Sequence, residues 1–166
     1  MNVFRPATLG GIEVSKNVAN YKSTAETALG ALVILNDNAK TFTTVASVEQ
    51  AKEGVYALWQ NPNAENHSVR GDGTNSYKLG ESEYGRLLYL PALFGIKDGV
   101  EMGGDIIVGT HTKGVILVAN AAGKYEATGD ASEYAISFVV QDVIEEYDFT
   151  RYVCEVVPGE DAVASE

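Results

Sequence analysis

The amino-acid sequence predicts a single, mainly β domain, built as a β-barrel or a β-sandwich. Its 166 residues match the length of one domain, which is commonly about 100–200 residues. Short apolar runs recur along the chain between clusters of glycine, asparagine and other turn-forming residues, a pattern typical of many short strands. The clearest alternation lies near the C-terminal end, where Tyr134–Val140 and Tyr152–Val156 each place every second side chain on one face.

We divide the chain into three parts. Residues 1–28 alternate poorly and contain Pro6 and two adjacent glycines, which predicts an extended N-terminal arm with room for one short strand. Such an arm is expected to be ordered only by contact with another chain or with a distant part of the fold. Residues 29–157 are the predicted β domain, and residues 158–166 are predicted to be a disordered acidic tail.

The domain begins with a predicted hairpin followed by a short helix. Leu32–Leu35 is an apolar run typical of a buried strand, and Lys40–Val45 is the expected return strand after a turn of asparagine and aspartate. A serine followed three residues later by a glutamine has the spacing of a capping box, which predicts a helix over Val48–Lys52 that ends at Gly54.

The next strand, Val55–Gln60, is expected to place Val55, Ala57 and Trp59 on one face. It is followed by Asn61–Gly85, a long stretch rich in polar residues and glycine, which is typical of a functional or mobile loop. Further strands are expected at Arg86–Leu90, Asp105–Val108 and Val115–Val118, and from Lys124 onward.

A repeated pattern links two of these hairpins. Gly30–Lys40 (GALVILNDNAK) and Gly114–Lys124 (GVILVANAAGK) each run from a glycine through an apolar strand and a turn asparagine to a lysine that opens the return strand. A polar spacer and another apolar strand follow each unit. We therefore predict that residues 30–45 and 114–127 form equivalent strand–turn–strand units within one domain.

Charge is unevenly distributed along the chain. The formal net charge is -11, and residues 1–125 contain 12 acidic and 11 basic side chains, whereas residues 126–166 contain 11 acidic side chains and one basic, Arg151. Nucleic-acid binding is driven by clustered lysine and arginine, so we expect no nucleic acid as a partner. The acidic region is either a solvated surface or a surface that steers the protein toward a basic partner, and both alternatives stay open.

The sequence contains no recognisable motif for catalysis or metal binding. His67, His111 and Cys154 are too far apart in sequence for a zinc motif, and neither a P-loop nor a nucleophile elbow is found. The acidic residues around Asp142–Asp148 lack the glycine and the spacing of a calcium loop. We predict no catalytic residue, no cofactor and no metal, and we interpret Cys154 as a buried structural thiol.

The chain is expected to be soluble and made in the cytoplasm. A single cysteine fits a reducing compartment. Met1–Pro6 lacks a basic start followed by an apolar run, so we expect no signal peptide. The apolar runs are also much shorter than the ~20 residues that a membrane helix needs, so we expect no membrane contact.

Aromatic residues supply the candidate contacts with a partner. The chain has nine tyrosines, and those in loop-like surroundings are the better candidates, because tyrosine gives contact area at a low entropic cost. The predicted partner-contact residues, taken from the arm and from the loop-rich stretch, are Phe4, Arg5, Tyr21, Tyr77 and Tyr84.

The sequence resembles small phage head proteins of the decoration or cement type. The resemblance is carried by the extended segment up to Ala28, by the paired patterns at Gly30–Asn38 and Lys113–Asn120, and by the closing strands Ala135–Val140 and Arg151–Val157 around an acidic turn. It implies a β-barrel or β-tulip core with a flexible arm. It also implies binding between capsomers, on the outer surface of an assembled capsid, without catalysis.

The expected function is therefore that of a structural virion protein on the capsid surface. Its expected partner is the lattice of the major capsid protein, and a homo-oligomer stays open as a further assembly. One alternative is a carbohydrate- or receptor-binding β-sandwich that uses Asn61–Gly85. Another is a small all-β enzyme whose active site is shared between subunits.

Overall fold

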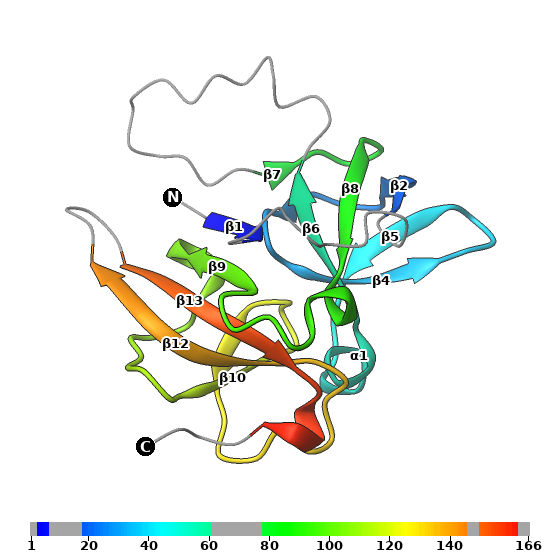
Figure 1. Cartoon of the computed structure of the whole chain (residues 1–166). Coiled ribbons are helices and arrows are strands. Elements are labelled where there is room, and N and C mark those ends of the chain that lie inside the picture. The colour runs from blue at the N-terminus through cyan, green and yellow to red at the C-terminus, as the bar shows by residue number, and fades with distance from the viewer. Residues whose placement is uncertain (1–2, 7–17, 61–77, 146–149, 163–166) are drawn as a thin grey trace.

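The computed structural model describes residues 3–6, 18–60, 78–145 and 150–162, and its architecture is mainly β, as predicted (Figure 1). The described chain contains one α-helix, α1 (Val48–Glu53), and short 3-10 helices. The strands are β1 (Val3–Pro6), β2 (Val18–Ser23), β3 (Thr27–Ala28), β4 (Leu32–Asn36), β5 (Thr41–Thr44), β6 (Tyr56–Gln60), β7 (Lys78–Leu79), β8 (Tyr84–Tyr89), β9 (Val100–Gly103), β10 (Ile116–Ala119), β11 (Tyr125–Ala127), β12 (Ser137–Glu145) and β13 (Thr150–Val157).

The strands form a closed barrel, a larger sheet and a small ribbon. The barrel has the order β2-β5-β4-β6-β8, and it occupies the upper right of Figure 1. The six-stranded sheet has the order β1-β9-β13-β12-β10-β11 and occupies the lower left. The ribbon consists of β3 and β7. No helix among the described residues is both long and apolar enough to cross a membrane.

The two predicted hairpins are present and are built in the same way. β4 pairs antiparallel with β5, and β10 pairs antiparallel with β11. Each first strand follows a glycine in the left-handed region, Gly30 at φ 83° and Gly114 at φ 88°. In each turn the asparagine side chain accepts a backbone hydrogen bond, Asn36 from Ala39 at 3.1 Å and Asn120 from Ala122 at 2.9 Å. The sequence repeat therefore corresponds to a structural repeat.

The repeat extends well beyond the hairpins. In the first unit, β6 pairs with β4, β8 with β6 and β2 with β8, and in the second unit β12 pairs with β10, β13 with β12 and β9 with β13. A register irregularity occurs at the same place in both units, between Leu58 and Gln60 and between Val140 and Asp142. We call β2, β4, β5, β6 and β8 the first unit, and β9 to β13 the second unit.

Each unit is also closed by a parallel contact to its second hairpin strand. In the first unit, β2 pairs in parallel with β5, with Ser23 opposite Phe42. In the second unit, Ile107 forms a single parallel bridge with Tyr125, and the Val108 N–H donates to the Tyr125 carbonyl at 2.8 Å. The second unit is thus a looser version of the same barrel.

Alternation along the strands divides the apolar side chains between two main clusters. One cluster lies inside the first barrel and consists of Tyr21, Val33, Phe42, Leu58, Leu79 and Leu87. The other joins the units, because Leu32, Ala57 and Leu88 of the first barrel belong to the same cluster as the core residues of the second unit. Full burial of each leucine contributes about 1.5–3 kcal/mol, so this shared core holds the two units together as one body.

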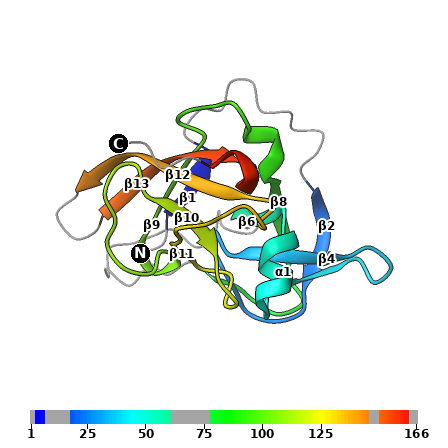
Figure 2. The same cartoon turned by 90° about the horizontal axis from the view of Figure 1, so that it is seen from below.

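Helix α1 lies where the two units meet (Figure 2). The Ser47 side chain accepts a hydrogen bond from the Gln50 N–H at 3.2 Å, and Gly54 ends the helix, as the capping pattern predicts. The helix buries Ala51 in the shared core, and the Lys52 carbonyl accepts from the Ala135 N–H of the second unit at 2.7 Å.

The prediction of a strand over Asp105–Val108 is wrong. Gly104–Ile106 forms a 3-10 turn, and Gly104 has a φ of 77°, which takes the chain out of the extended region. The strand lies earlier, at Val100–Gly103, where a four-residue segment gave too short an apolar pattern to be recognised.

The predicted N-terminal arm is partly built into the sheets. Within residues 1–28, β1 pairs with β9, a distant part of the fold, whereas β2 belongs to the barrel and β3 to the ribbon. The described part of this segment therefore does not stand apart from the β domain. The remaining residues of the predicted arm lie outside the described residues.

The predicted disordered tail also needs correction. Gly159–Asp161 forms a 3-10 turn, and the Gly159 N–H donates to the Tyr134 carbonyl at 3.0 Å. Gly159 is buried, and Ala162 packs against a small apolar cluster on the second unit. The chain is therefore held in place up to residue 162, and residues 163–166 lie outside the described part.

Candidate functional site

The first barrel presents a surface of aromatic and cationic side chains. Strand β8 alternates, so Gly85 and Leu87 point into the barrel whereas Tyr84 and Arg86 are exposed on its outer face. Trp59 of β6 and Lys22 of β2 reach the same outer face from the neighbouring strands. We call the surface formed by Lys22, Trp59, Tyr84 and Arg86 the aromatic face.

Two cation–aromatic pairs organise this face. The Lys22 Nζ atom lies 5.0 Å from the centre of the Tyr84 ring, and Lys22 and Tyr84 are directly opposite each other in the register of β2 and β8. The Arg86 guanidinium carbon lies 6.0 Å from the centre of the Trp59 ring. Such pairs contribute about 0.5–1 kcal/mol at exposed sites, enough to bias the orientation of the rings.

The composition of the aromatic face is typical of a protein–protein contact. Tyr84 is 47% exposed, which makes it one of the few large apolar side chains exposed among the described residues. Tyrosine, tryptophan and arginine are the residues most enriched at the energetic centres of interfaces. The four side chains stand on paired strands of a closed barrel, so they are presented on a rigid support.

The structure places the predicted partner-contact residues in different environments, and only some of them lie on the surface. Tyr84 lies on the aromatic face. Phe4 and Tyr21 are only 2% and 5% exposed, so within one chain both rings are part of the core and not of its outer surface. Arg5 lies in β1 but its side chain is outside the described residues, as is all of Tyr77.

Tyr21 has a structural role at the end of the first barrel. Its hydroxyl donates to the Asp37 carboxylate, and the Lys40 Nζ atom lies 3.3 Å from that hydroxyl and 5.0 Å from the ring centre. These contacts tie the β4–β5 turn to β2. The sequence pattern did not reveal them, because the three residues are far apart in the chain.

Trp59, Lys22 and Arg86, which complete the aromatic face, were not among the predicted contact residues. A usable signal was the predicted shared face of Val55, Ala57 and Trp59 on the predicted strand that corresponds to β6, together with the alternation along β8. That these two strands lie side by side, and that β2 joins them, follows only from the barrel pairing.

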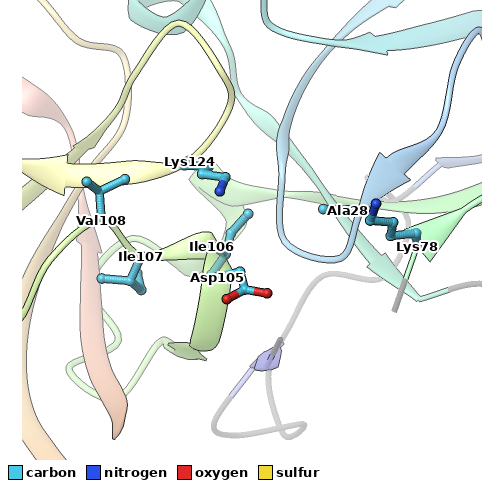
Figure 3. A pocket seen from close by; sticks show the side chains of 7 residues that line it. All are labelled: Ala28, Lys78, Asp105, Ile106, Ile107, Val108 and Lys124. Atoms are coloured by element: carbon cyan, nitrogen blue, oxygen red, sulfur yellow. The ribbon is translucent and has the colours of Figure 1, made fainter. Parts of the chain in front are cut away.

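A second feature is an open pocket between the β3–β7 ribbon and the second unit (Figure 3). Its volume is about 640 Å³, and its lining consists of Ala28, Lys78, Asp105, Ile106, Ile107, Val108 and Lys124. The charges of the lining are largely balanced, because Lys78 pairs with Glu26 at 2.5 Å and Asp105 stands in the same lining as Lys124. The pocket thus has no dominant charge with which to select a ligand.

A third feature is an open groove beside the β4–β5 hairpin, with a volume of about 420 Å³ and a mixed lining that includes Ile34, Leu35 and Phe42. Its polar lining consists of Thr24, Asn36, Asp37, Thr41 and Thr43. These side chains offer hydroxyl, amide and carboxylate groups, which are suited to hydrogen bonding with a hydroxyl-rich ligand.

The acidic side chains of the C-terminal region lie on the surface of the second unit. Among the described residues after residue 125, the exposed ones are Glu126, Asp130, Glu133, Asp142, Glu145, Glu160 and Asp161. No three histidine, cysteine, aspartate or glutamate side chains in the described ranges come together in the manner of metal ligands. The more enclosed Glu101 instead forms an ion pair with Arg151 at 2.9 Å.

Cys154 and Tyr125 lie in the shared core. Both are fully buried, and burial raises the pKa of the thiol and of the phenol well above their ordinary values. The Tyr125 hydroxyl donates to the Gly30 carbonyl at 2.9 Å. Cys154 is therefore a buried thiol, as predicted, and its raised pKa disfavours the reactive thiolate.

Comparison with known proteins gave no match to a family model, to a curated protein or to a solved structure.

Proposed function

We propose that this chain is a structural accessory protein that binds the outer surface of an assembled virus capsid and stabilises it without catalysis. In this proposal the protein is made in the host cytoplasm and then joins the lattice of the major capsid protein. The observation that carries the proposal is the aromatic face, an exposed Tyr84 with Lys22, Trp59 and Arg86 on a rigid barrel. The choice of a capsid as the partner comes from the resemblance in sequence pattern to decoration proteins.

The barrel is suited to this role because it presents the face without prior rearrangement. Its strands are paired into a closed ring, so docking need not order the backbone beneath the contact. An accessory protein that adds to a preformed lattice gains affinity from such preorganisation.

The test is binding of purified protein to undecorated capsids, measured by co-sedimentation. Tyr84→Ala removes the exposed ring, and Val48→Ala is the matched control, since Val48 is also 47% exposed but lies on α1. We expect Tyr84→Ala to weaken binding about tenfold or more, as for an interface hot spot, and Val48→Ala to change it less than about twofold. Equal effects of the two substitutions would contradict docking through the aromatic face.

A second candidate function is binding of a carbohydrate on a virion or cell surface. The groove beside the β4–β5 hairpin favours it, because Asn36, Asp37 and three threonines supply hydrogen-bonding groups beside apolar side chains around a space of about 420 Å³. A glycan array separates the two functions. Specific glycan binding that is lost in Asn36→Ala, together with no capsid binding, would replace the capsid proposal with this one.

A further inference from the structure

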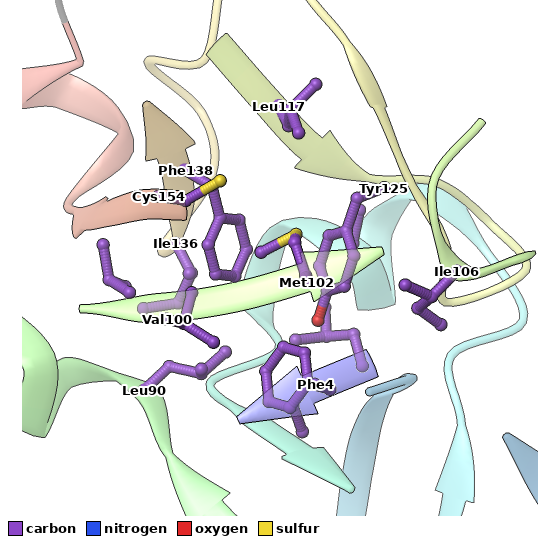
Figure 4. Packing of buried hydrophobic residues seen from close by; sticks show 14 of the residues in the cluster. Phe4, Leu90, Val100, Met102, Ile106, Leu117, Tyr125, Ile136, Phe138 and Cys154 are labelled. Carbon is purple, nitrogen blue, oxygen red and sulfur yellow. The ribbon is translucent and has the colours of Figure 1, made fainter. Parts of the chain in front are cut away.

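Strand β1 is anchored by a single aromatic side chain in a fitted socket. Phe4 is 2% exposed, and its ring stacks on Tyr125 with a centroid distance of 6.4 Å and an interplanar angle of 12° (Figure 4). Gly30 makes room for it, since a Cβ atom there would lie 2.8 Å from the Phe4 Cβ. The hydrogen bond from the Tyr125 hydroxyl to the Gly30 carbonyl fixes the socket wall. We call the space lined by Gly30, Met102 and Tyr125 the Phe4 socket.

Next to the Phe4 socket, β1 pairs along the backbone edge of β9. Val3–Pro6 pairs antiparallel with Val100–Gly103 of β9, and Phe4 stands opposite Met102. β1 is the last strand of its sheet, and within the described ranges its only strand neighbour is β9. All residues that form the socket and the edge are far from β1 in the chain. The site is therefore a complete receptor for a short strand with one aromatic anchor.

We propose that β1 is exchangeable between copies, so that the β9 edge and the Phe4 socket of one molecule accept Val3–Pro6 of a second. The contacts made within one chain and between two chains would be the same. The balance between them is then set by local concentration, which is the usual basis of strand exchange.

The length of the connection limits how far apart the two exchanging copies can lie. Eleven residues separate Pro6 from Val18, and a chain of that length spans at most about 40 Å. The occupant is assigned as a second copy because the structure itself shows that this sequence fits the receptor. The inference does not depend on capsid binding.

A disulfide trap tests the exchange in the full-length protein. Arg5 and Glu101 are opposite each other in the register of β1 and β9, and opposed residues of antiparallel strands lie within the range of a disulfide. One chain carries Arg5→Cys and a second chain, of different size through a tag, carries Glu101→Cys. The two are mixed and oxidised with oxidised glutathione. Cys154 is fully buried and does not compete.

A covalent heterodimer forms efficiently only when β1 of one chain lies on β9 of the other. The control for random collision replaces Glu101→Cys with Val48→Cys, a position that is 47% exposed on α1. We expect at least about ten times more heterodimer with Glu101→Cys than with Val48→Cys. Adding Phe4→Ala to the Arg5→Cys chain should reduce the yield to the control level, and Phe4→Leu should give an intermediate yield.

Equal yields with Glu101→Cys and Val48→Cys would overturn the proposal, whatever the Phe4 variants do. That comparison keeps Phe4 intact, so it stays decisive if Phe4→Ala prevents folding. A yield that is high but unchanged by Phe4→Leu would also overturn it, because pairing would then not depend on the socket.

Discussion

At the scale of single residues, two fully buried ionisable groups, Cys154 and Tyr125, make the stability of the fold depend on alkaline pH. Burial raises the pKa of Cys154 above its ordinary 9.0 and the pKa of Tyr125 above its ordinary 10.0. Both groups therefore keep their protons in the folded protein, whereas the unfolded chain releases them as the pH rises. Below about pH 9 these two groups do not reduce the free energy of unfolding. Above about pH 9 their ionisation in the unfolded chain reduces it progressively.

The expected loss is about 1.4 kcal/mol per pH unit for each group that is ionised only in the unfolded chain. Urea unfolding between pH 7 and pH 10.5 measures it. Cys154→Ala should flatten the part of the fall that begins near pH 9 and leave the later part, which Tyr125 causes. A free energy of unfolding that stays constant up to pH 10.5 would show that these groups are not buried as described.

Single residues also show why the candidate site was only partly predictable. Phe4, Tyr21 and Tyr84 are all aromatic residues in strands, and the sequence offers no simple way to separate them. Tyr84 is exposed because Gly85 and Leu87 take the inward positions of β8, whereas Tyr21 is inward on β2. The inward or outward sense of a short strand depends on partners that are distant in sequence.

At the scale of elements, local signals were recognised and long-range pairings were not. The glycine, the apolar run and the turn asparagine identified both hairpins, because a hairpin is closed by its own turn. The parallel contacts of Ser23 with Phe42 and of Ile107 with Tyr125 leave no local trace, so the barrel closure was not predictable. The 3-10 turn Gly159–Asp161 was not predicted, because it is held by contacts with Tyr134 and other distant residues and not by a local sequence pattern.

That last element, the 3-10 turn Gly159–Asp161, gives a sharp test of the corrected C-terminal end. A Cβ atom at Gly159 would lie 2.0 Å from the Ala131 carbonyl oxygen and 2.3 Å from that of Tyr134. We expect Gly159→Ala to lower the free energy of unfolding by about 1–3 kcal/mol or to release the turn. Gly129→Ala is the control, since nothing lies within 4 Å of its Cβ position, and its effect should stay within about 0.5 kcal/mol.

Chemical denaturation of both variants makes this comparison. If Gly159→Ala were as stable as Gly129→Ala, and hydrogen exchange around Tyr134 were unchanged, the turn would not be docked on the domain.

At the scale of the whole molecule, the two units divide the surface between them. The aromatic face belongs to the first unit, whereas the net negative charge is concentrated in residues 126–166, which contain β12 and β13 of the second unit. Burying a region whose net charge is -10 would need a matching density of basic groups on the partner. Docking through the first unit avoids that cost and leaves the acidic unit in solvent.

The most direct test of this account is the affinity of the full-length protein for undecorated capsids at about 0.05 M and at about 0.5 M salt. Exposed charges are screened within about 10 Å at 0.1 M salt, so a contact made by the acidic unit would weaken steeply. We expect saturable binding with a fixed number of copies per capsid and a Kd that changes less than about threefold between the two conditions. Absence of binding at both salt concentrations would contradict the proposed function.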